Sequence, residues 1–312
     1  MSVRVGVAIG GWPFADTATA DPFWAFVERA EELGFDSLWI TDRLISRSIF
    51  LEPLAAMAAA AGRTQQLKFG PAVLVLPLRN PVLLAKEIAT IDFLSGGRML
   101  PAFGIGGDEQ QREYEAAGVR KEERGARSDE MVTVLRRLWS EERVTHHGRF
   151  YHLTDATIAP RPLQRELPVW FGGRSEAAFR RVGRLGDGWL ASFITPEEFA
   201  AGVACIKRYA AESGRAIDED HYGMIVTTCV AGSVEEARAR LGPAARRTDI
   251  DPAAVSLLGT PADCVAQMQR YLDAGCSKFV LRPAGPPETI LPQLEIIARE
   301  IAPAFDRTMA KA

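Results

Sequence analysis

Two glycines followed by an arginine and a serine form the clearest anion-binding motif in the chain, at Gly172, Gly173, Arg174 and Ser175. The motif follows a short apolar segment and precedes an apolar repeat with helical spacing. Backbone N–H groups and the dipole at a helix N-terminus attract anions, and Ser175 and Arg174 would add a hydroxyl donor and a positive charge. The spacing differs from that of a Walker P-loop. The motif predicts a phosphate site, with a plain strand-to-helix turn capped by Ser175 as the alternative.

A second glycine-rich segment contains Gly104, Gly106 and Gly107 and follows the apolar residues 98–103. Backbone without side chains allows a ligand to approach closely. The third glycine is not at the offset of a dinucleotide-binding fingerprint, so that chemistry is not indicated. A turn that merely needs positive φ is the alternative interpretation.

These motifs must be positioned by regular elements, and short apolar segments alternate with helical patterns along the whole chain. We expect eight strands, at residues 3–9, 35–40, 67–76, 98–103, 169–171, 187–191, 222–231 and 278–281. Most are followed by a helical pattern, which indicates a parallel sheet. Eight repeats favour a single α/β domain over residues 1–312, a (β/α)8 TIM barrel. Residues 141–167 lack a clear period and are expected to form an insertion.

In such barrels the active site lies at the C-terminal ends of the strands. Asp42 and Arg43 follow the expected strand 35–40, and Glu109 follows the second glycine-rich segment. We therefore expect these three side chains to face the same mouth as the 172–175 turn.

Composition narrows the function classes. Of the 312 residues 47% are apolar and 25% charged, so the chain can bury a large core. Its net charge of −3 provides no excess of basic residues for binding nucleic acid or an anionic membrane. We see no signal peptide and no apolar run long enough to span a bilayer. The cysteines are scattered without a CxxC motif, which favours reduced thiols in a cytoplasmic protein. His146, His147 and His152 lack matching ligands, so we expect no metal site.

Five segments in fixed order resemble one family: residues 30–43 (AEELGFDSLWITDR), 76–107 (LPLRNPVLLAKEIATIDFLSGGRMLPAFGIGG), 112–119, 169–192 (VWFGGRSEAAFRRVGRLGDGWLAS) and 259–283. The chain is similar to the bacterial luciferase-like flavin and deazaflavin oxidoreductases, and most similar to their F420-dependent branch. The resemblance implies a TIM barrel with an insertion at about 141–167, a homodimer, and bound coenzyme F420 or FMN.

The resemblance also implies roles for particular residues. The turn made by Gly172, Gly173, Arg174 and Ser175 matches the family's phosphate-binding turn. The AFGIGG segment matches a second cofactor contact, which implies that Phe103, Gly104 and Gly106 lie beside the cofactor.

Two further positions match cofactor contacts of the family. The bond between Ala72 and Val73 falls where the family often has a non-proline cis peptide, and the resulting bulge supports the back face of the cofactor ring. Asp42 matches an aspartate that hydrogen-bonds the deazaflavin in F420-dependent members.

One position departs from the family pattern, because Arg43 stands where a histidine is common. An arginine cannot act as a base near neutral pH, but it can orient an anionic substrate or stabilise charge on a reduced ring. Glu109 matches a proton donor of some deazaflavin members, with a carboxylate that merely decorates a helix start as the alternative. Arg43 and Glu109 are therefore the candidate catalytic residues.

The cofactor would carry the redox chemistry, while the protein would supply position and electrostatics. The resemblance favours hydride transfer between F420 and a small organic substrate. The first alternative is an FMN-dependent monooxygenase that uses reduced FMN and O2 and needs a partner reductase. The second is a flavin-binding protein without catalysis.

Overall fold

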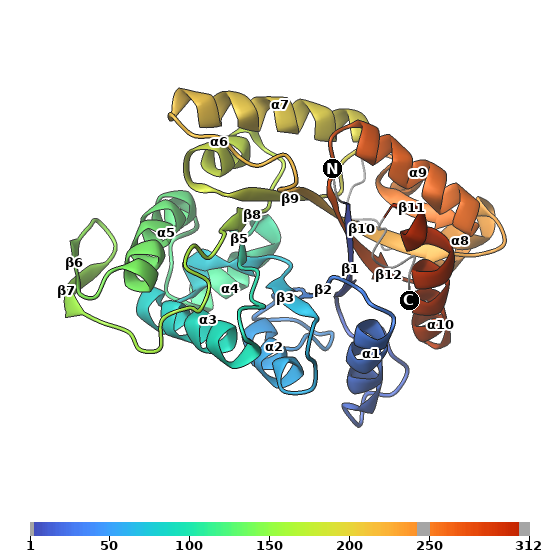
Figure 1. Ribbon diagram of the computed structural model, residues 1–312, viewed down its shortest axis with the longest axis horizontal. Helices are drawn as coiled ribbons and strands as arrows, with labels where there is room; N and C mark the ends of the chain where they lie inside the picture. Colours follow the sequence, from blue (N-terminus) through green and yellow to red (C-terminus); the bar gives the residue numbers. More distant parts are fainter. Residues whose placement is uncertain (1–2, 242–249, 306–312) are drawn as a thin grey trace.

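Parallel strands form a barrel surrounded by helices, which confirms the predicted TIM-like fold (Figure 1). The computed structural model describes residues 3–241 and 250–305. The strands of the main sheet are β1 (Arg4–Ile9), β2 (Ser37–Ile40), β3 (Lys68–Pro71), β4 (Leu74–Val75), β5 (Ala102–Gly104), β8 (Trp170–Phe171), β9 (Gly188–Ser192), β10 (Tyr222–Val230), β11 (Ser256–Gly259) and β12 (Lys278–Pro283). Their order is β3-β2-β1-β12-β10-β9-β8-β5-β4, and each predicted strand contributes to it.

The ring closes at the third predicted strand, which divides into β3 and β4. β3 pairs with β2 and β4 pairs with β5, so this one stretch of chain joins both ends of the sheet. Between the two halves, Ala72 and Val73 are linked by a cis peptide bond, at the position that the family resemblance implied. The N–H of Phe69 donates to the carbonyl of Arg98 at 2.9 Å, and the N–H of Leu100 donates to the carbonyl of Phe69 at 2.7 Å. These bonds complete the barrel.

Two features lie outside the ring. β11, which we did not predict, pairs among the described residues with the C-terminal residues 227–230 of β10. The predicted insertion holds an antiparallel hairpin, β6 (Val144–His147) and β7 (His152–Ala156), at the edge of the molecule (Figure 1). The buried carboxylate of Asp92 accepts bonds from the backbone of residues 163 and 164, which ties the end of this excursion to the barrel.

Helices cover the outer face of the strands, as the sequence patterns predicted, and pack buried apolar residues against it. They are α1 (Asp21–Glu32), α2 (Pro53–Ala61), α3 (Pro81–Ser95), α4 (Gln111–Ala116), α5 (Arg124–Ser140), α6 (Glu176–Leu185), α7 (Pro196–Glu212), α8 (Val234–Leu241), α9 (Pro261–Asp273) and α10 (Ile290–Ile296). Local sequence sets several ends. Asn80 caps α3 by accepting from the N–H groups of Val82 and Leu83, and Gly96 ends that helix in the left-handed conformation (φ 71°).

Large and small residues fill the barrel interior in complementary positions. Trp39 and Trp170 occupy the centre and are almost fully buried. A Cβ at Gly70 would lie 2.3 Å from the Trp39 ring, and one at Gly188 would lie 2.5 Å from the Trp170 ring. Both glycines are therefore required by close packing rather than by backbone conformation.

A buried ion cluster closes the N-terminal end of the barrel. Asp36 accepts hydrogen bonds from Lys278 and, at 3.0 Å, from Lys68. Only 8% of the Lys278 side chain is exposed. Burial acts to raise the pKa of Asp36, but the charges of Lys278 and Lys68 outweigh it and hold the pKa well below its ordinary value. The carboxylate thus stays charged and compensates the buried lysine.

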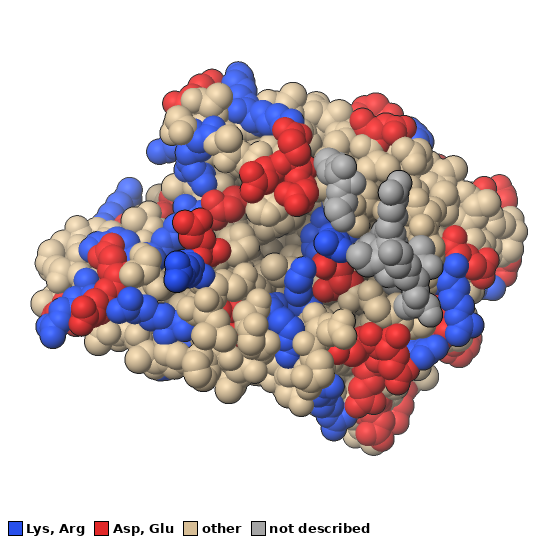
Figure 2. All heavy atoms as spheres, viewed as in Figure 1, with Lys and Arg blue, Asp and Glu red and all other residues tan. Residues whose placement is uncertain are grey.

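The described helices include none long and apolar enough to cross a membrane. Acidic and basic side chains are interspersed over the face seen in Figure 2, without a large area of one sign. This pattern on that face agrees with the small net charge of the chain.

Replacing Asp36 should destabilise the fold. We expect Asp36→Asn to lower the free energy of unfolding by about 3–5 kcal/mol, because Lys278 would remain buried without its counter-charge. Glu28, which forms an exposed ion pair with Arg63, provides the control. Glu28→Gln should lower the free energy of unfolding by less than about 1 kcal/mol. Urea unfolding of the three proteins measures both values.

The pH dependence gives a second readout of the same variant. In the unfolded chain an aspartate has a pKa of about 3.9. Since the folded pKa of Asp36 is lower, its stabilisation is present above that pH and is lost as the pH falls toward the folded pKa. Wild-type stability should therefore drop more steeply in acid than that of Asp36→Asn, and equal slopes would contradict this role for Asp36.

Candidate active site

A cavity of about 330 Å³ opens at the C-terminal ends of the strands, on the side formed by β2, β4, β5 and β8. It brings together most of the residues predicted from sequence: Asp42, Arg43, Ala72, Val73, Gly104, Gly106, Glu109, Gly172, Gly173 and Ser175. They come from four separate strand ends and the loops that follow them. The barrel mouth therefore gathers them as expected for this fold.

The turn from Gly172 to Ser175 forms one wall of the cavity and leads into α6. Ser175 is the N-cap of this helix, and its Oγ accepts from the N–H of Ala178 at 3.3 Å. Gly173 has a φ of 104°, and a Cβ there would lie 2.7 Å from the Cβ of Ala178, so only glycine suits the position. The N–H of Gly172 donates to the carbonyl of Phe103 at 2.8 Å. The structure therefore shows the N-cap of the plain strand-to-helix turn. The phosphate site stays a prediction, since an N-cap leaves the first N–H groups of the helix directed outward.

Two arginines that we did not predict line the same cavity beside the turn. Arg124 begins α5, and its Nε is buried without a hydrogen-bond partner among the described residues. Arg181 lies one turn into α6 and is held by Asp129. A buried N–H donor without an acceptor is costly, so a ligand anion at this position would satisfy Arg124.

Two predicted cofactor contacts lie elsewhere. The Phe103 side chain is fully buried in the core and packs edge-on against Phe171, so only its carbonyl supports the turn. Arg174 is exposed, contacts the carbonyl of Phe193 at 3.3 Å, and lines an outer cavity of about 730 Å³. That outer cavity shares Arg43, Glu109 and Gly173 with the inner one, so the two are continuous.

Asp42 is held in place by two bonds. One oxygen accepts from the guanidinium of Arg79 at 2.7 Å, and the other accepts from the N–H of Val75 at 2.9 Å. Burial raises the pKa of Asp42, although the charge of Arg79 and the bond from Val75 act to lower it. The carboxylate therefore joins the end of β2 to β4 next to the Ala72–Val73 bond, which makes it a positioning group for this wall of the cavity.

Arg43 is held by a second buried carboxylate. The Nε of Arg43 lies 3.1 Å from Glu113 Oε1, and the N–H of Leu44 donates to the other oxygen at 3.3 Å. Only 2% of the Glu113 side chain is exposed. Glu109, by contrast, is exposed at the rim, where it borders both the inner and the outer cavity. The site thus combines a fixed cation with a solvated carboxylate.

The residues that sequence reasoning missed share one property, which is that their roles depend on contacts between distant segments. Arg79, Glu113, Arg124 and Arg181 all sit in helices or loops where charged residues are ordinary. Arg79 follows β4 closely, but Arg124 comes after β5, α4 and two short 3-10 turns, so distance from a strand end along the sequence did not identify these residues.

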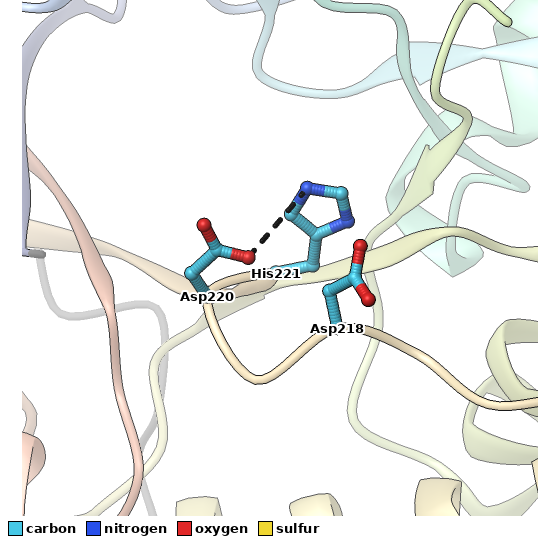
Figure 3. A group of neighbouring side chains, drawn as sticks. All are labelled: Asp218, Asp220 and His221. Carbon is cyan, nitrogen blue, oxygen red and sulfur yellow. Dashed lines mark ion pairs between the residues drawn. The ribbon is translucent and has the colours of Figure 1, made fainter. Parts of the chain in front are cut away.

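A group of possible metal ligands lies at the opposite end of the barrel. Asp218, Asp220 and His221 precede β10, and their ligand atoms lie within 4.8 Å of one another (Figure 3). His221 Nδ1 is 2.7 Å from the carbonyl of Asp187, and both aspartates are exposed. The group is remote from the mouth and has no part in the chemistry considered below.

The parallel barrel, the glycine-rich turn at a helix N-terminus and the charged mouth are the features of a TIM barrel with a ligand site at the C-terminal ends of its strands. The chain belongs to the luciferase-like monooxygenase family, whose model matches residues 3–291. This match confirms the family resemblance that the sequence segments carried.

Curated relatives differ in the reaction that their names describe. An F420-dependent glucose-6-phosphate dehydrogenase of Amycolatopsis mediterranei is 29% identical over 83% of this chain and 87% of its own length. An FMNH2-dependent dimethylsulfone monooxygenase of Pseudomonas putida is 33% identical over 67% of this chain and 56% of its own. An uncharacterized Mycobacterium tuberculosis protein is 34% identical over 53% of this chain. The match covers 56% of that relative, little more than half of its length.

Solved structures agree with the fold. The monooxygenase RslO1 of Streptomyces bottropensis superimposes with a TM-score of 0.83 at 24% identity, over 97% of this chain and 99% of that one. At this identity the likeness shows the shared barrel.

Removing Asp42 tests whether its carboxylate holds the cavity wall. We expect Asp42→Ala to lower the free energy of unfolding by about 1–3 kcal/mol, because Arg79 and the N–H of Val75 both lose an acceptor. Asp42→Asn keeps an acceptor and should lose less. Thermal and urea unfolding measure the difference, with the exposed Asp108→Ala as control. An Asp42→Ala protein as stable as wild type would show that the carboxylate does not hold β4.

Proposed function

We propose that this protein is an F420-dependent oxidoreductase that transfers a hydride between the coenzyme and a small organic substrate. The observation that carries the proposal is the continuous cavity from the 172–175 turn to Ala72 and Val73, with the buried Arg124 Nε beside the turn. The F420-dependent relative, matched along 83% of the chain, supports the deazaflavin over FMN.

The residues present fit a phosphate-bearing flavin or deazaflavin. The helix N-terminus after Gly173, the Ser175 hydroxyl and the two arginines would hold the phosphate. Val73 and Gly104 would flank the ring. A Cβ at Gly104 would lie 2.6 Å from Val73 Cγ2, so a larger residue at position 104 would clash with Val73. When bound, the deazaflavin supplies a hydride donor or acceptor.

Arg43 and Glu109 would divide the remaining work. Arg43, fixed by Glu113, would hold negative charge near the ring or on the substrate, and it cannot accept a proton. Glu109, at the rim of the cavity, would donate a proton to the bound substrate or accept one from it. A reaction that needs a histidine base after the β2 aspartate is therefore not the one that we propose.

The specific alternative is a monooxygenase that uses reduced FMN and O2 and a partner reductase. It is supported by the FMNH2-dependent relative from Pseudomonas putida. The same cradle would serve either cofactor, since both carry a phosphate on a side chain from the ring system. A flavin-binding protein without catalysis is the remaining candidate, and turnover of any substrate above background would exclude it.

Cofactor titration tests the proposal directly. We expect purified protein to bind F420 at micromolar or lower concentration and FMN at least tenfold more weakly, as followed by cofactor fluorescence. The opposite preference would support the monooxygenase. Binding of neither would overturn the cofactor assignment and the role given to the 172–175 turn.

An arginine variant tests the phosphate cradle. Arg124→Gln should weaken cofactor binding about 10- to 100-fold, because a charge-assisted bond to phosphate is worth about 1.5–3 kcal/mol. Binding of the matching phosphate-free compound, riboflavin or the deazaflavin without its side-chain phosphate, should be unchanged by the same variant. Arg120→Gln, four residues earlier and largely exposed, is the control. Equal weakening with and without the phosphate would place Arg124 elsewhere than at the phosphate.

We further propose that the chain forms a homodimer through α3. Leu83, Phe93 and Leu94 on this helix have 57%, 50% and 66% of their surface exposed. Leu83 and Leu94 are eleven positions apart and so lie on the same helix face. A second copy could cover this face through a two-fold, self-complementary contact.

Light scattering tests the dimer. We expect a solution mass of twice the 34.1 kDa chain for the wild type and a shift to monomer for Leu83→Glu with Leu94→Glu, since charges would be buried in the contact. Leu44→Glu, on another exposed apolar side chain, should keep the dimer. A wild-type monomer, or a double variant of unchanged mass, would remove α3 as the interface.

A further inference from the structure

A second cavity, of about 360 Å³, lies in the other half of the barrel mouth. It is formed by the ends of β1, β10 and β12 together with the start of α10. Gly10, Phe193, Thr227 and Arg282 are among its lining residues. None of these residues belongs to the cofactor cavity described above.

The second cavity adjoins the first through two side chains. Arg282 lines it and donates to Thr41 Oγ1 at 3.4 Å, and Thr41 lines the cofactor cavity. Phe193 lines it and also the outer cavity that continues into the cofactor site. Phe193 has a φ of 55°, a conformation that non-glycine residues rarely adopt and that recurs at functional sites. A molecule in the second cavity would therefore lie beside a bound cofactor.

The charge of the second cavity has one sign among its described lining residues. Among the described residues that line it, the charged side chains are Arg240 and Arg282, with no aspartate or glutamate. The guanidinium of Arg240 donates to the carboxylate of Glu236 at 2.6 Å and to the carbonyl of Val230 at 3.2 Å. Arg282 projects from β12 against Gly10 and toward Thr41, and so lies nearer the cofactor side.

The rest of the wall is largely apolar. Phe26, Val255 and Ile290 are buried and face the cavity together with Phe193. Thr227 and Ser256 add hydroxyl groups. The volume lies near the lower end of the range of about 300–1,000 Å³ for small-molecule sites. The cavity thus suits a compact apolar molecule with one negatively charged end.

We propose that this cavity is the substrate site and that the substrate is a small organic anion with an apolar body, whose carboxylate, sulfonate or phosphate group binds Arg282. The inference rests on the proposed function, since it makes the occupant the hydride partner of the neighbouring cofactor. A guanidinium has five N–H donors in a planar fork, so one that already binds Thr41 can also bind an oxyanion in bidentate geometry. The apolar wall then orients the rest of the molecule toward the ring.

Calorimetric titration with matched six-carbon probes tests the proposal. Hexanoate, hexane-1-sulfonate and hexyl phosphate carry the anion, and hexanamide and hexan-1-ol are the neutral counterparts. Each is titrated at constant ionic strength into the full chain, both free and saturated with the cofactor that it binds. We expect at least one anion to bind tenfold or more tightly than both neutral compounds, and the ranking of the three identifies the preferred group.

Variants assign the effect to Arg282. Arg282→Gln should remove the preference for the anion, Arg282→Lys should restore part of it, and the exposed Arg299→Gln should leave it intact. Melting temperature and cofactor affinity show whether each variant is folded. Should Arg282→Gln not fold, the anion preference of the wild type and of Arg282→Lys still decides the question.

Two outcomes would overturn the inference while leaving the proposed function standing. One is equal binding of charged and neutral probes by protein that binds the cofactor normally, and the other is an anion preference unchanged in folded Arg282→Gln. Failure of the cofactor titration is a separate result, because the anion preference is also measured in the cofactor-free chain.

Discussion

Closure of the sheet at the third strand is the constraint on which the rest of the molecule depends. Phe69 bonds to the backbone of Arg98 and Leu100, while β3 and β4 pair with opposite neighbours. Because the ring is closed, every strand ends at the same mouth, and residues from Asp42 to Ser175 meet around one cavity. An open sheet of the same strands would spread them along an edge. Below the mouth, Trp39 and Trp170 pack against glycines and fill the barrel interior, so the cavity is closed at its base by a packed core.

Charged groups at the two ends of the barrel have different tasks. At the N-terminal end, Asp36 and Lys278 neutralise each other in the interior, which serves the fold. At the mouth, the buried carboxylates of Asp42 and Glu113 each hold an arginine and a backbone N–H. These pairs fix the wall of the cavity and the direction of Arg43. Preorganised charges of this kind act without the reorganisation that water would need.

The mouth divides into two halves with different chemistry. One half offers a helix N-terminus and two arginines around a glycine-rich turn, which suits a phosphate-bearing cofactor. The other half is apolar, with Arg282 at the side nearer the first. The family uses one barrel for reactions as different as those named for its F420- and FMN-dependent members. A common cofactor half and a variable substrate half, as proposed above, would account for that range, since fold alone does not determine the reaction.

The sequence by itself determined the eight strands, most helix positions and the glycine turns, because these follow from local periodicity and from residues that only particular backbone conformations accept. It also identified about half of the residues that line the cavity, some because strand ends in a parallel barrel share one face and others, such as Ala72 and Val73, from the family resemblance. The tertiary structure alone decided which charges meet. Glu113 with Arg43, Arg79 with Asp42, and the buried Nε of Arg124 depend on packing between segments far apart in the chain. No local pattern encodes such contacts, because an arginine or glutamate in a helix looks the same in sequence whether it faces solvent or a cavity.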